Sequence, residues 1–596
     1  MRRTRFPIAF PSDLKAMAVK SLFNTLLVAA CLMSAAATGQ ETVGDRSNTT
    51  VHGANFTTGT QAAAKFGVHE IVLTGNGSVV HPFDTLAAVK FVPPSGEKNA
   101  KTVWAFYDGE MIWRARVYTS ETGEWSWSST CDTDAGLHGK SGKFQCEPSQ
   151  LRGRLLPHPK NLRQWMTEDG RWFLNIVDTA YFLLSTKDEM GQPIPDGDMA
   201  AYVQDAVDHG ITSFMAYAVP GPASWFEEGS WTDNYFADAG FTRLRLENFQ
   251  SSDRRLRWLL DHHPNVGLEL ILFPRGTHGL VDEWFWKSLA ASQKERILRY
   301  MVARYAAYPQ VFWLIANDST YDTNHPNNNA YAREVGAYFK KHDPWQHPLS
   351  TGHGRHVEFF FADEDWATYL HVENAYDLGA AQYAKYHRYG KPVLLGEDRY
   401  EQYDPNRDPT DMRYYQRRLY WAWLLSGGSA NYGGRWWVVH PYRETGKRPA
   451  DFHNPDSGVT HSFKARLTGL DSVRYIRDYF TQRGIELSDF EPDPALVKDS
   501  AGAEGTRSPK LIRRGQQEFL IYHPNAAADG KEARVDGTKA PGVVVDLNAA
   551  SGKFAVEWYC AEDGKSQEDA DIAGGMKINL ASPFSGCDVV LRLVRK

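Results

Sequence analysis

The sequence predicts a multidomain α/β and β protein, with a central (β/α)8 TIM barrel between two β-rich domains. We expect an immunoglobulin-like β-sandwich on the N-terminal side and a small β-sandwich on the C-terminal side. Three observations lead to this prediction. The chain has 596 residues, too many for one ordinary domain. Both ends carry short alternating segments typical of antiparallel sheets. The middle alternates apolar strands with amphipathic helices.

Residues 1–39 have the pattern of an export signal peptide. A basic stretch is followed by the apolar run "SLFNTLLVAACLMSAAA" and then by small residues suited to cleavage. We therefore expect an exported protein, periplasmic or secreted. Cys31 in "VAAC" also resembles a lipoprotein anchor, but the apolar "LMSAAA" after it favours a cleaved signal. Nothing later is long and apolar enough to span a bilayer.

The charge balance is acidic and argues against a nucleic-acid partner. The formal net charge is −6, and removal of residues 1–39, with five Lys/Arg and one Asp, makes it about −10. Such a chain repels a polyanion. The 19 Trp residues suit either a large aromatic core or sites that stack on sugar rings.

The two flanking regions contain short strands separated by turns. Residues 45–155 include "HEIVLT", "AAVKFV" and "IWRARVYTS", with Gly, Pro and Asn between such segments. Residues 495–596 include "EFLIYHP", "GVVVDL" and "KFAVEWYC". Four cysteines follow the leader, one close pair in each flank, which favours two disulfides: Cys131–Cys146 and Cys560–Cys587.

Residues 160–490 are predicted to form the barrel. Eight buried-strand candidates alternate with helix-like runs such as "QKERILRYMVARYAAYP", and the length suits eight strand–helix units. A doubly wound sheet is the alternative, but no glycine-rich phosphate-binding motif follows the first strand. The candidate strands are "WFLNIVD", "ITSFMAYAV", "VGLELILF", "VFWLIAND", "HPLSTGH", "WATYLHV", "KPVLLGE" and "GSANYGG".

Polar residues at the carboxyl ends of these strands form the candidate active site, because a barrel carries its site at that face. Asp318 and Glu397 end strands 4 and 7. Two carboxyl groups about 5–5.5 Å apart suit glycoside hydrolysis with retention, in which one protonates the leaving oxygen while the other attacks the anomeric carbon. The candidate substrate-binding residues are Asn317, Asp178, His353, Tyr400, His371, Arg275 and Trp436.

Each of these residues also has a structural interpretation. Asp318 can be a turn or helix-cap residue, and Asp178 can be an N-cap. His353 and His371 are equally compatible with hydrogen-bonded core positions. The long segment "PGPASWFEEGSWTDNYFADAGF" after strand 2 can wall a sugar subsite or pack on the N-terminal domain. No metal-ligand spacing or serine-hydrolase elbow is present, so neither a metal nor a cofactor is expected.

The segment "DGRWFLNIVDTAYFLL" resembles the first strand of the apiosidase-like glycoside hydrolases. "HPLSTGH", "KPVLLGEDRYE" and "LLSGGSANYGG" resemble later segments of that family in the same order. The resemblance covers roughly residues 160–490 and implies a clan A barrel with a retaining mechanism. It assigns the acid/base to Asp318 and the nucleophile to Glu397. The flanks resemble the β-domains found beside such barrels.

The chain departs from this family at three places. "IAND" stands where Gly-Gly-Asp is common, Tyr181 where Trp is usual, and "LHVEN" where a Gln-Ser-Gly-His run is common. These changes indicate that the catalytic residues are kept while the sugar-contacting rim differs. The resemblance therefore does not extend to apiose specificity.

Together these features predict an exported retaining glycoside hydrolase that acts on a plant or algal polysaccharide or its oligosaccharides. Two alternatives remain open from sequence alone. One is a non-catalytic carbohydrate-binding protein on a barrel scaffold. The other is an inverting hydrolase or a lyase, and a carboxyl separation of about 6.5–9.5 Å would favour inversion.

Overall fold

A computed structural model provides the structure of the protein. The chain divides into residues 1–51 and 52–596, and every residue described here lies in the second unit. The leader predicted at residues 1–39 lies outside the described residues. The structure describes residues 55–59, 61–187, 193–219, 232–273, 286–317, 319–352, 358–373, 385–397, 409–432, 469–526, 535 and 537–596.

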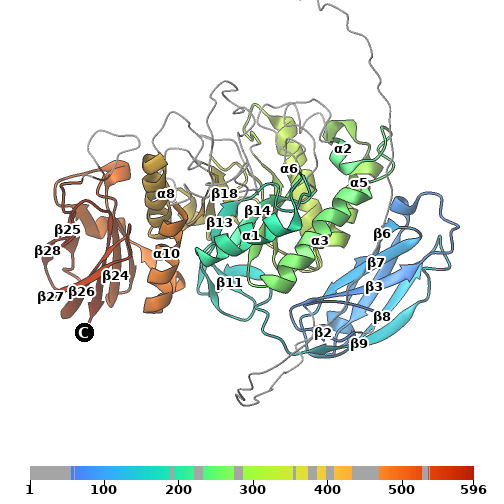
Figure 1. The fold of residues 1–596 in the computed structure, drawn as a ribbon, viewed down its shortest axis with the longest axis horizontal. Coiled ribbons are helices and arrows are strands. Elements are labelled where there is room, and N and C mark those ends of the chain that lie inside the picture. The colour runs from blue at the N-terminus through green and yellow to red at the C-terminus, as the bar shows by residue number, and fades with distance from the viewer. Residues whose placement is uncertain are drawn as a thin grey trace, which may run out of the picture. The chain divides into compact units, whose positions relative to one another are not determined.

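A parallel sheet of eight strands forms the centre of the protein (Figure 1). The hydrogen-bonded order is β17-β16-β15-β14-β13-β20-β19-β18. The strands are apolar runs because both of their faces are buried. One face points into the barrel lumen, and helices cover the other. Each overlaps a segment predicted as a strand, and β13 and β18 extend one residue beyond it, so the (β/α)8 prediction is confirmed. The strands are β13 Ile176–Thr179, β14 Ser213–Tyr217, β15 Gly267–Phe273, β16 Val311–Ala316, β17 Leu349–Ser350, β18 Leu370–Glu373, β19 Val393–Glu397 and β20 Ser429–Tyr432.

The barrel is nearly closed, and the seam lies between β17 and β18, which do not pair as strands. The backbone N–H of Thr368 donates to the carbonyl of Leu349 at 2.8 Å across this seam. Further along, the N–H of His371 donates to the hydroxyl of Ser350 at 3.1 Å. A side-chain oxygen therefore satisfies a backbone donor that a regular ladder would pair with a carbonyl.

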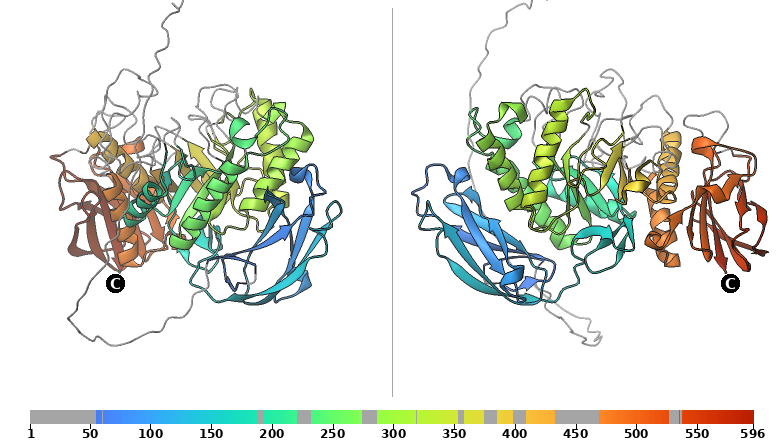
Figure 2. Two further views of the ribbon diagram at one scale, coloured as in Figure 1. Left: turned by 45° about the vertical axis from the view of Figure 1, so that its right-hand side comes forward. Right: turned by 180° about the vertical axis from the view of Figure 1, so that it is seen from behind.

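Helices lie around the barrel (Figures 1 and 2). In α5, Ile297, Met301 and Tyr305 are buried at intervals of four residues, the spacing that places them on one helix face. The α-helices within the described residues are α1 Asp196–Asp208, α2 Thr232–Tyr235, α3 Leu246–His262, α5 Ala291–Tyr305, α6 Pro326–His342, α8 Pro409–Leu424 and α10 Gly469–Arg483.

The N-terminal domain is built from two sheets, with the orders β1-β3-β7-β6 and β2-β9-β8-β4-β5. Figure 2 shows these strands in blue. Val89, Phe91, Trp125 and Phe144 are buried members of its core. The strands are β1 Phe56–Thr58, β2 Ala63–Ala64, β3 Val68–Thr74, β4 Ala87–Val92, β5 Lys101–Trp104, β6 Phe106–Gly109, β7 Ile112–Tyr118, β8 Gly123–Cys131 and β9 Ser141–Glu147.

A three-stranded antiparallel sheet follows the N-terminal domain and closes the base of the barrel. It consists of β10 Leu155–His158, β11 Asn161–Thr167 and β12 Trp172–Phe173. Trp165 is buried, with its ring centroid 6.0 Å from that of Phe312 and 5.5 Å from that of Tyr369. Both partners lie in or next to the early parts of barrel strands, so Trp165 packs at the base of the lumen.

The C-terminal domain also has two sheets, with the orders β21-β23-β24-β29-β26-β27 and β22-β25-β28. Arg417 of α8 forms a buried ion pair with Asp588 at 2.6 Å, which joins this domain to the barrel helices. The strands are β21 Glu491–Pro492, β22 Val497–Asp499, β23 Lys510–Arg514, β24 Glu518–His523, β25 Gly542–Asp546, β26 Lys553–Cys560, β27 Ser566–Ala573, β28 Lys577–Ala581 and β29 Val589–Arg595.

The four cysteines that follow the leader are free thiols in the structure. In the β8–β9 hairpin Cys146 pairs with Gly123, eight residues before Cys131. At about 3.3 Å per residue the two cysteines are about 26 Å apart along the strand, far beyond the reach of a disulfide. The Cys131–Cys146 pairing is therefore wrong. In the other pair, a hydrogen bond with the Cys560 thiol and burial raise the pKa of Cys587; a bridge there stays a prediction.

Buried charges join the N-terminal domain to the barrel. Arg116 of β7 donates to both carboxylate oxygens of Asp253 in α3, at 2.6 and 2.5 Å. Asp253 also accepts from Arg304 of α5 at 3.2 Å and from Tyr308 at 2.7 Å. Burial alone would raise the pKa of Asp253, but the charges of the two arginines hold it well below its ordinary value. On its other side, Arg116 donates to Glu70 at 2.8 Å.

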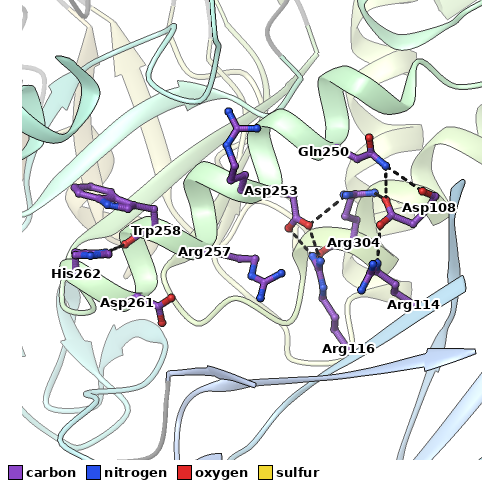
Figure 3. Close-up of a pocket in the computed structure, with 11 residues that line it drawn as sticks. Asp108, Arg114, Arg116, Gln250, Asp253, Arg257, Trp258, Asp261, His262 and Arg304 are labelled. Atoms are coloured by element: carbon purple, nitrogen blue, oxygen red, sulfur yellow. Dashed lines mark hydrogen bonds and ion pairs between the residues drawn. The ribbon is translucent and has the colours of Figure 1, made fainter. Parts of the chain in front are cut away.

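A cavity of about 440 Å³ lies beside this network (Figure 3). Its lining comes from the N-terminal domain and from α3 and α5, not from the carboxyl ends of the barrel strands. It therefore belongs to the interface between the domains rather than to the predicted active site. The lining residues are Asp108, Arg114, Arg116, Gln250, Asp253, Arg254, Arg257, Trp258, Asp261, His262 and Arg304.

Replacement of Asp253 with Asn should strongly destabilise the protein. The substitution leaves the buried guanidinium of Arg116 without one of its two carboxylates, which costs about 3–5 kcal/mol of unfolding free energy. Urea unfolding of Asp253→Asn and wild type measures the loss. Because the folded-state pKa of Asp253 is depressed, its contribution is present above the ordinary pKa of about 3.9 and disappears as the pH falls through the folded value.

Glu124→Gln provides the matched control for this prediction. Glu124 pairs with Lys143 at 2.7 Å, but their side chains are 61% and 65% exposed. We expect that variant to lose less than about 1 kcal/mol. Equal stability losses in the two variants would contradict the importance of the buried network.

Candidate active site

Glu397 is the last residue of β19 and lies at the carboxyl end of the barrel. Its side chain is nearly buried, with 4% of the residue exposed. The hydroxyl of Tyr181, which lies just beyond β13, donates to Oε2 of Glu397 at 2.5 Å. This bond fixes the direction of the carboxylate that the sequence predicts to be the nucleophile.

Asn317, the first residue after β16, is bound to the same tyrosine. Its Nδ2 donates to the Tyr181 oxygen at 3.0 Å. The Oδ1 atom of Asn317 is buried and has no hydrogen-bond partner in the part of the chain that the structure describes. Tyr181 therefore connects strand 4 with strand 7 and holds Asn317, the neighbour of Asp318, close to Glu397. Asp318 itself lies outside the described residues.

A β-bulge sets the position of Glu397. Residues before it pair regularly, His371 with Leu394 and Val372 with Leu395, but Glu373 then pairs with Glu397. Gly396 is the extra residue of the bulge. A Cβ atom at position 396 would come within 1.9 Å of the His371 ring, so only glycine fits there. The bulge places Glu397 on the same face as Glu373, where strict alternation would have turned it away.

The Gly396 peptide is also held from the neighbouring strand. The side-chain amide of Asn431 in β20 donates to the Gly396 carbonyl at 2.5 Å. The hydroxyl of Thr179 in β13 donates to Oδ1 of Asn431 at 3.0 Å. These two bonds connect strands 1, 8 and 7 directly beneath Glu397.

His371 lies inside the barrel, one layer below the mouth. It is completely buried, and its Nδ1 is 2.7 Å from Oε1 of Glu269 in β15, across the lumen. The hydroxyl of Tyr369 donates to the same oxygen at 2.7 Å. Burial, followed by the charge of Glu269, raises the pKa of Tyr369 well above its ordinary value, which keeps this donor protonated. His371 therefore occupies a hydrogen-bonded core position, one of the two interpretations that the sequence allowed, and its contact with a sugar stays a prediction.

Asp178 lies on the outer face of β13. It is level with Phe214 of β14, and Tyr202 of α1 donates to its Oδ2 at 2.6 Å. The next residue, Thr179, is level with Met215, and Met215 is level with Glu269, which faces the lumen. Thr179 therefore faces the lumen as well, and Asp178, one residue earlier, faces the opposite way. Asp178 thus points toward the helices, and its predicted role in binding substrate is not supported by this position.

The remaining predicted site residues lie outside the described residues. They are Asp318, His353, Tyr400, Arg275 and Trp436. Among the residues that are described, no group of three or more His, Cys, Asp and Glu side chains could hold a metal ion.

Sequence reasoning missed three residues that shape the site. Tyr181 was noted only as a departure from Trp, although it follows the end of strand 1. Gly396 precedes Glu397 in an otherwise apolar strand, and glycine in a strand is a signal for a bulge. Glu373 ends strand 6 in "LHVE", and the rule that identified Glu397 applies to it equally.

An eight-stranded parallel barrel with carboxylates at its carboxyl-end mouth is an architecture of glycoside hydrolases. Comparisons agree with this class. A "putative glycoside hydrolase" from Bacteroides vulgatus superposes with a TM-score of 0.64 at 16% identity, over 91% of this chain and 100% of that one. A glycoside hydrolase family 5 protein from the same organism gives 0.56 at 16% identity, over 75% and 93%. At these identities the likeness shows the fold.

The family is shown by its sequence model. Residues 159–485, more than half of the chain, match the apiosidase-like catalytic domain. The protein therefore belongs to the apiosidase-like family, as the resemblance predicted. Residues 62–132 match a domain of unknown function, DUF5060. No curated protein matches the chain. Fold and family together support a glycosidase.

Replacement of Gly396 with Ala should destabilise the protein and disturb the mouth of the barrel. The new methyl group would overlap the His371 ring, which is held by Glu269 and cannot retreat without loss of that contact. Overpacking of this kind costs about 1–3 kcal/mol. Thermal unfolding of Gly396→Ala measures the effect.

Gly197→Ala is the control, because a Cβ atom at that position in α1 meets nothing within 4 Å. It should be neutral or slightly stabilising. A Gly396→Ala protein as stable as this control would contradict the packing described for His371.

Proposed function

We propose that the protein is an exported retaining glycoside hydrolase that acts on a plant or algal polysaccharide or its oligosaccharides. Glu397 is the nucleophile and Asp318 the general acid/base. The observation that carries this proposal is the position of Tyr181, whose oxygen binds both Glu397 and Asn317. It keeps the ends of strands 4 and 7 together, as a reaction that uses one carboxyl group from each strand requires.

In the first half of the reaction, Glu397 attacks the anomeric carbon while Asp318 protonates the departing oxygen. The result is a covalent glycosyl–enzyme intermediate. In the second half, Asp318 removes a proton from water, which displaces Glu397 from the sugar with a second inversion. The net outcome is retention of configuration. Tyr181 orients the Glu397 carboxylate, so that the other carboxylate oxygen can face the sugar.

Substrate contacts follow from the same geometry. Oδ1 of Asn317 is buried at the mouth and can accept a hydrogen bond from a sugar hydroxyl. An unsatisfied buried acceptor is costly, so a ligand that supplies a donor there gains affinity. His353, Tyr400, Arg275 and Trp436 are further proposed contacts, on the basis of their places in the sequence. Export rests on the leader predicted at residues 1–39.

A polysaccharide screen followed by mutagenesis tests this function. Wild-type protein is incubated with a panel of plant and marine polysaccharides, and NMR records the anomeric configuration of the fresh product; we expect retention. Asp318→Asn should lower kcat/KM by about 10²–10⁴, the usual contribution of a general acid/base. Glu397→Gln should lose at least as much, because the covalent step needs its carboxylate.

Asp322→Asn is the matched control for charge removal near strand 4. Asp322 lies four residues after Asp318 in the sequence, and its carboxylate pairs with His325 at 2.7 Å. It should keep wild-type activity. A product of inverted configuration, or full activity in folded Glu397→Gln, would overturn the proposed mechanism.

A further inference from the structure

A third carboxylate, Glu373, lies at the mouth of the barrel. It is the last residue of β18 and only 1% exposed. It is the register partner of Glu397 on the adjacent strand β19. Register partners on neighbouring parallel strands point to the same side of the sheet, so both side chains belong to one face of the mouth.

The direction of the Glu373 side chain follows from two contacts. Its Oε1 lies 3.8 Å from Nε2 of His371, the lumen-facing residue two positions earlier on the same strand. A Cβ atom at Gly352, just beyond β17, would lie 3.2 Å from the same Oε1 and 3.2 Å from Cα of Asn317. The carboxylate therefore reaches from strand 6 over the end of strand 5, toward Asn317 at the end of strand 4.

The buried pair of His371 and Glu269 lies in the lumen directly beneath Glu373. His371 has Glu269 on its Nδ1 side and Glu373 on its Nε2 side, so the imidazole lies between two carboxylates. Glu269 is itself held by Tyr369. A chain of polar contacts thus runs up the lumen from β15 to the mouth. Buried polar groups linked in this way have fixed orientations.

We propose that Glu373 is a substrate-contacting residue that accepts hydrogen bonds from sugar hydroxyls, and that His371 and Glu269 are its positioning residues. A sugar placed between strand 4 and strand 7 for the proposed reaction would have Glu373 beside its ring. A carboxylate has two oxygens and can accept from two neighbouring hydroxyls at once. This inference rests on the proposed function and assigns part of its specificity to strand 6.

Deoxy substrates provide the test. The 4-nitrophenyl glycoside that the wild type hydrolyses fastest, from a panel of common pentosides and hexosides, is compared with its monodeoxy analogues. We expect Glu373→Gln to lower kcat/KM by about 10- to 100-fold, since a hydrogen bond to a charged group contributes about 1.5–3 kcal/mol. Removal of one particular hydroxyl should lower kcat/KM strongly for the wild type but very little for Glu373→Gln. That hydroxyl is then the one that Glu373 binds.

Glu358→Gln is the matched control, because Glu358 is 74% exposed in its side chain and pairs with Lys385 at 3.0 Å. It should match wild type on every analogue. If Glu373→Gln lowered kcat/KM by the same factor on the parent glycoside and on every deoxy analogue, Glu373 would have a merely structural role and the inference would be overturned. Two results together would instead make Glu373 the proton donor and also overturn the inference. Glu373→Gln would keep a normal kcat/KM on a dinitrophenyl glycoside, and azide would restore its slowed turnover.

The positioning residues are tested in the same assay. Glu269→Gln and His371→Asn should each weaken the preference for the bound hydroxyl, and this effect should vanish when Glu373→Gln is already present. Thermal unfolding verifies that both variants fold. An unchanged preference in folded Glu269→Gln and His371→Asn would overturn the positioning role. A wild type that hydrolyses no glycoside or polysaccharide would contradict the proposed function itself, and that outcome is distinct from the others.

Discussion

The contact between the His371 ring and the backbone of Gly396 determines the geometry of the barrel mouth. The imidazole occupies the space that a side chain at position 396 would need, and a bulge forms in β19 at this glycine. Because of the bulge, Glu397 lies level with Glu373 instead of turning to the opposite face. The hydrogen bond from Tyr181 can then reach Glu397. A change at either His371 or Gly396 would alter the direction of the proposed nucleophile.

Buried charge serves two different purposes in this chain. At the domain interface, Arg116 and Arg304 are paired with Asp253, Glu70 and Asp108, and the groups hold domains together. Inside the barrel, the polar contacts lie in a column that ends at the mouth. Solvated surface pairs contribute little, whereas groups in such buried networks are fixed in orientation, which a catalytic site needs. The interface cavity and the proposed site are therefore separate features.

The sequence predicted the barrel well because its strands are apolar runs of the right length, with polar residues directly after them. It also located Glu397, since a carboxylate at the end of a buried strand is costly unless it is paired or has a function. It could not assign Asp178 to a face, because a shift of one residue reverses which side chains point inward. For the same reason the sequence did not show which face Glu373 shares with Glu397, because that relation depends on the bulge. Cys131 and Cys146 are close in sequence, but the hairpin register separates them.

Covalent trapping of the nucleophile tests the central claim most directly. The protein would be incubated with the 2-deoxy-2-fluoro glycosyl fluoride of the sugar that it releases, then digested and analysed by mass spectrometry. We predict one fluoroglycosyl adduct, on the peptide that contains Glu397, and loss of activity in proportion to labelling. An adduct on Glu373 or another carboxylate, or continued turnover without any adduct, would contradict the assignment of Glu397 as the nucleophile.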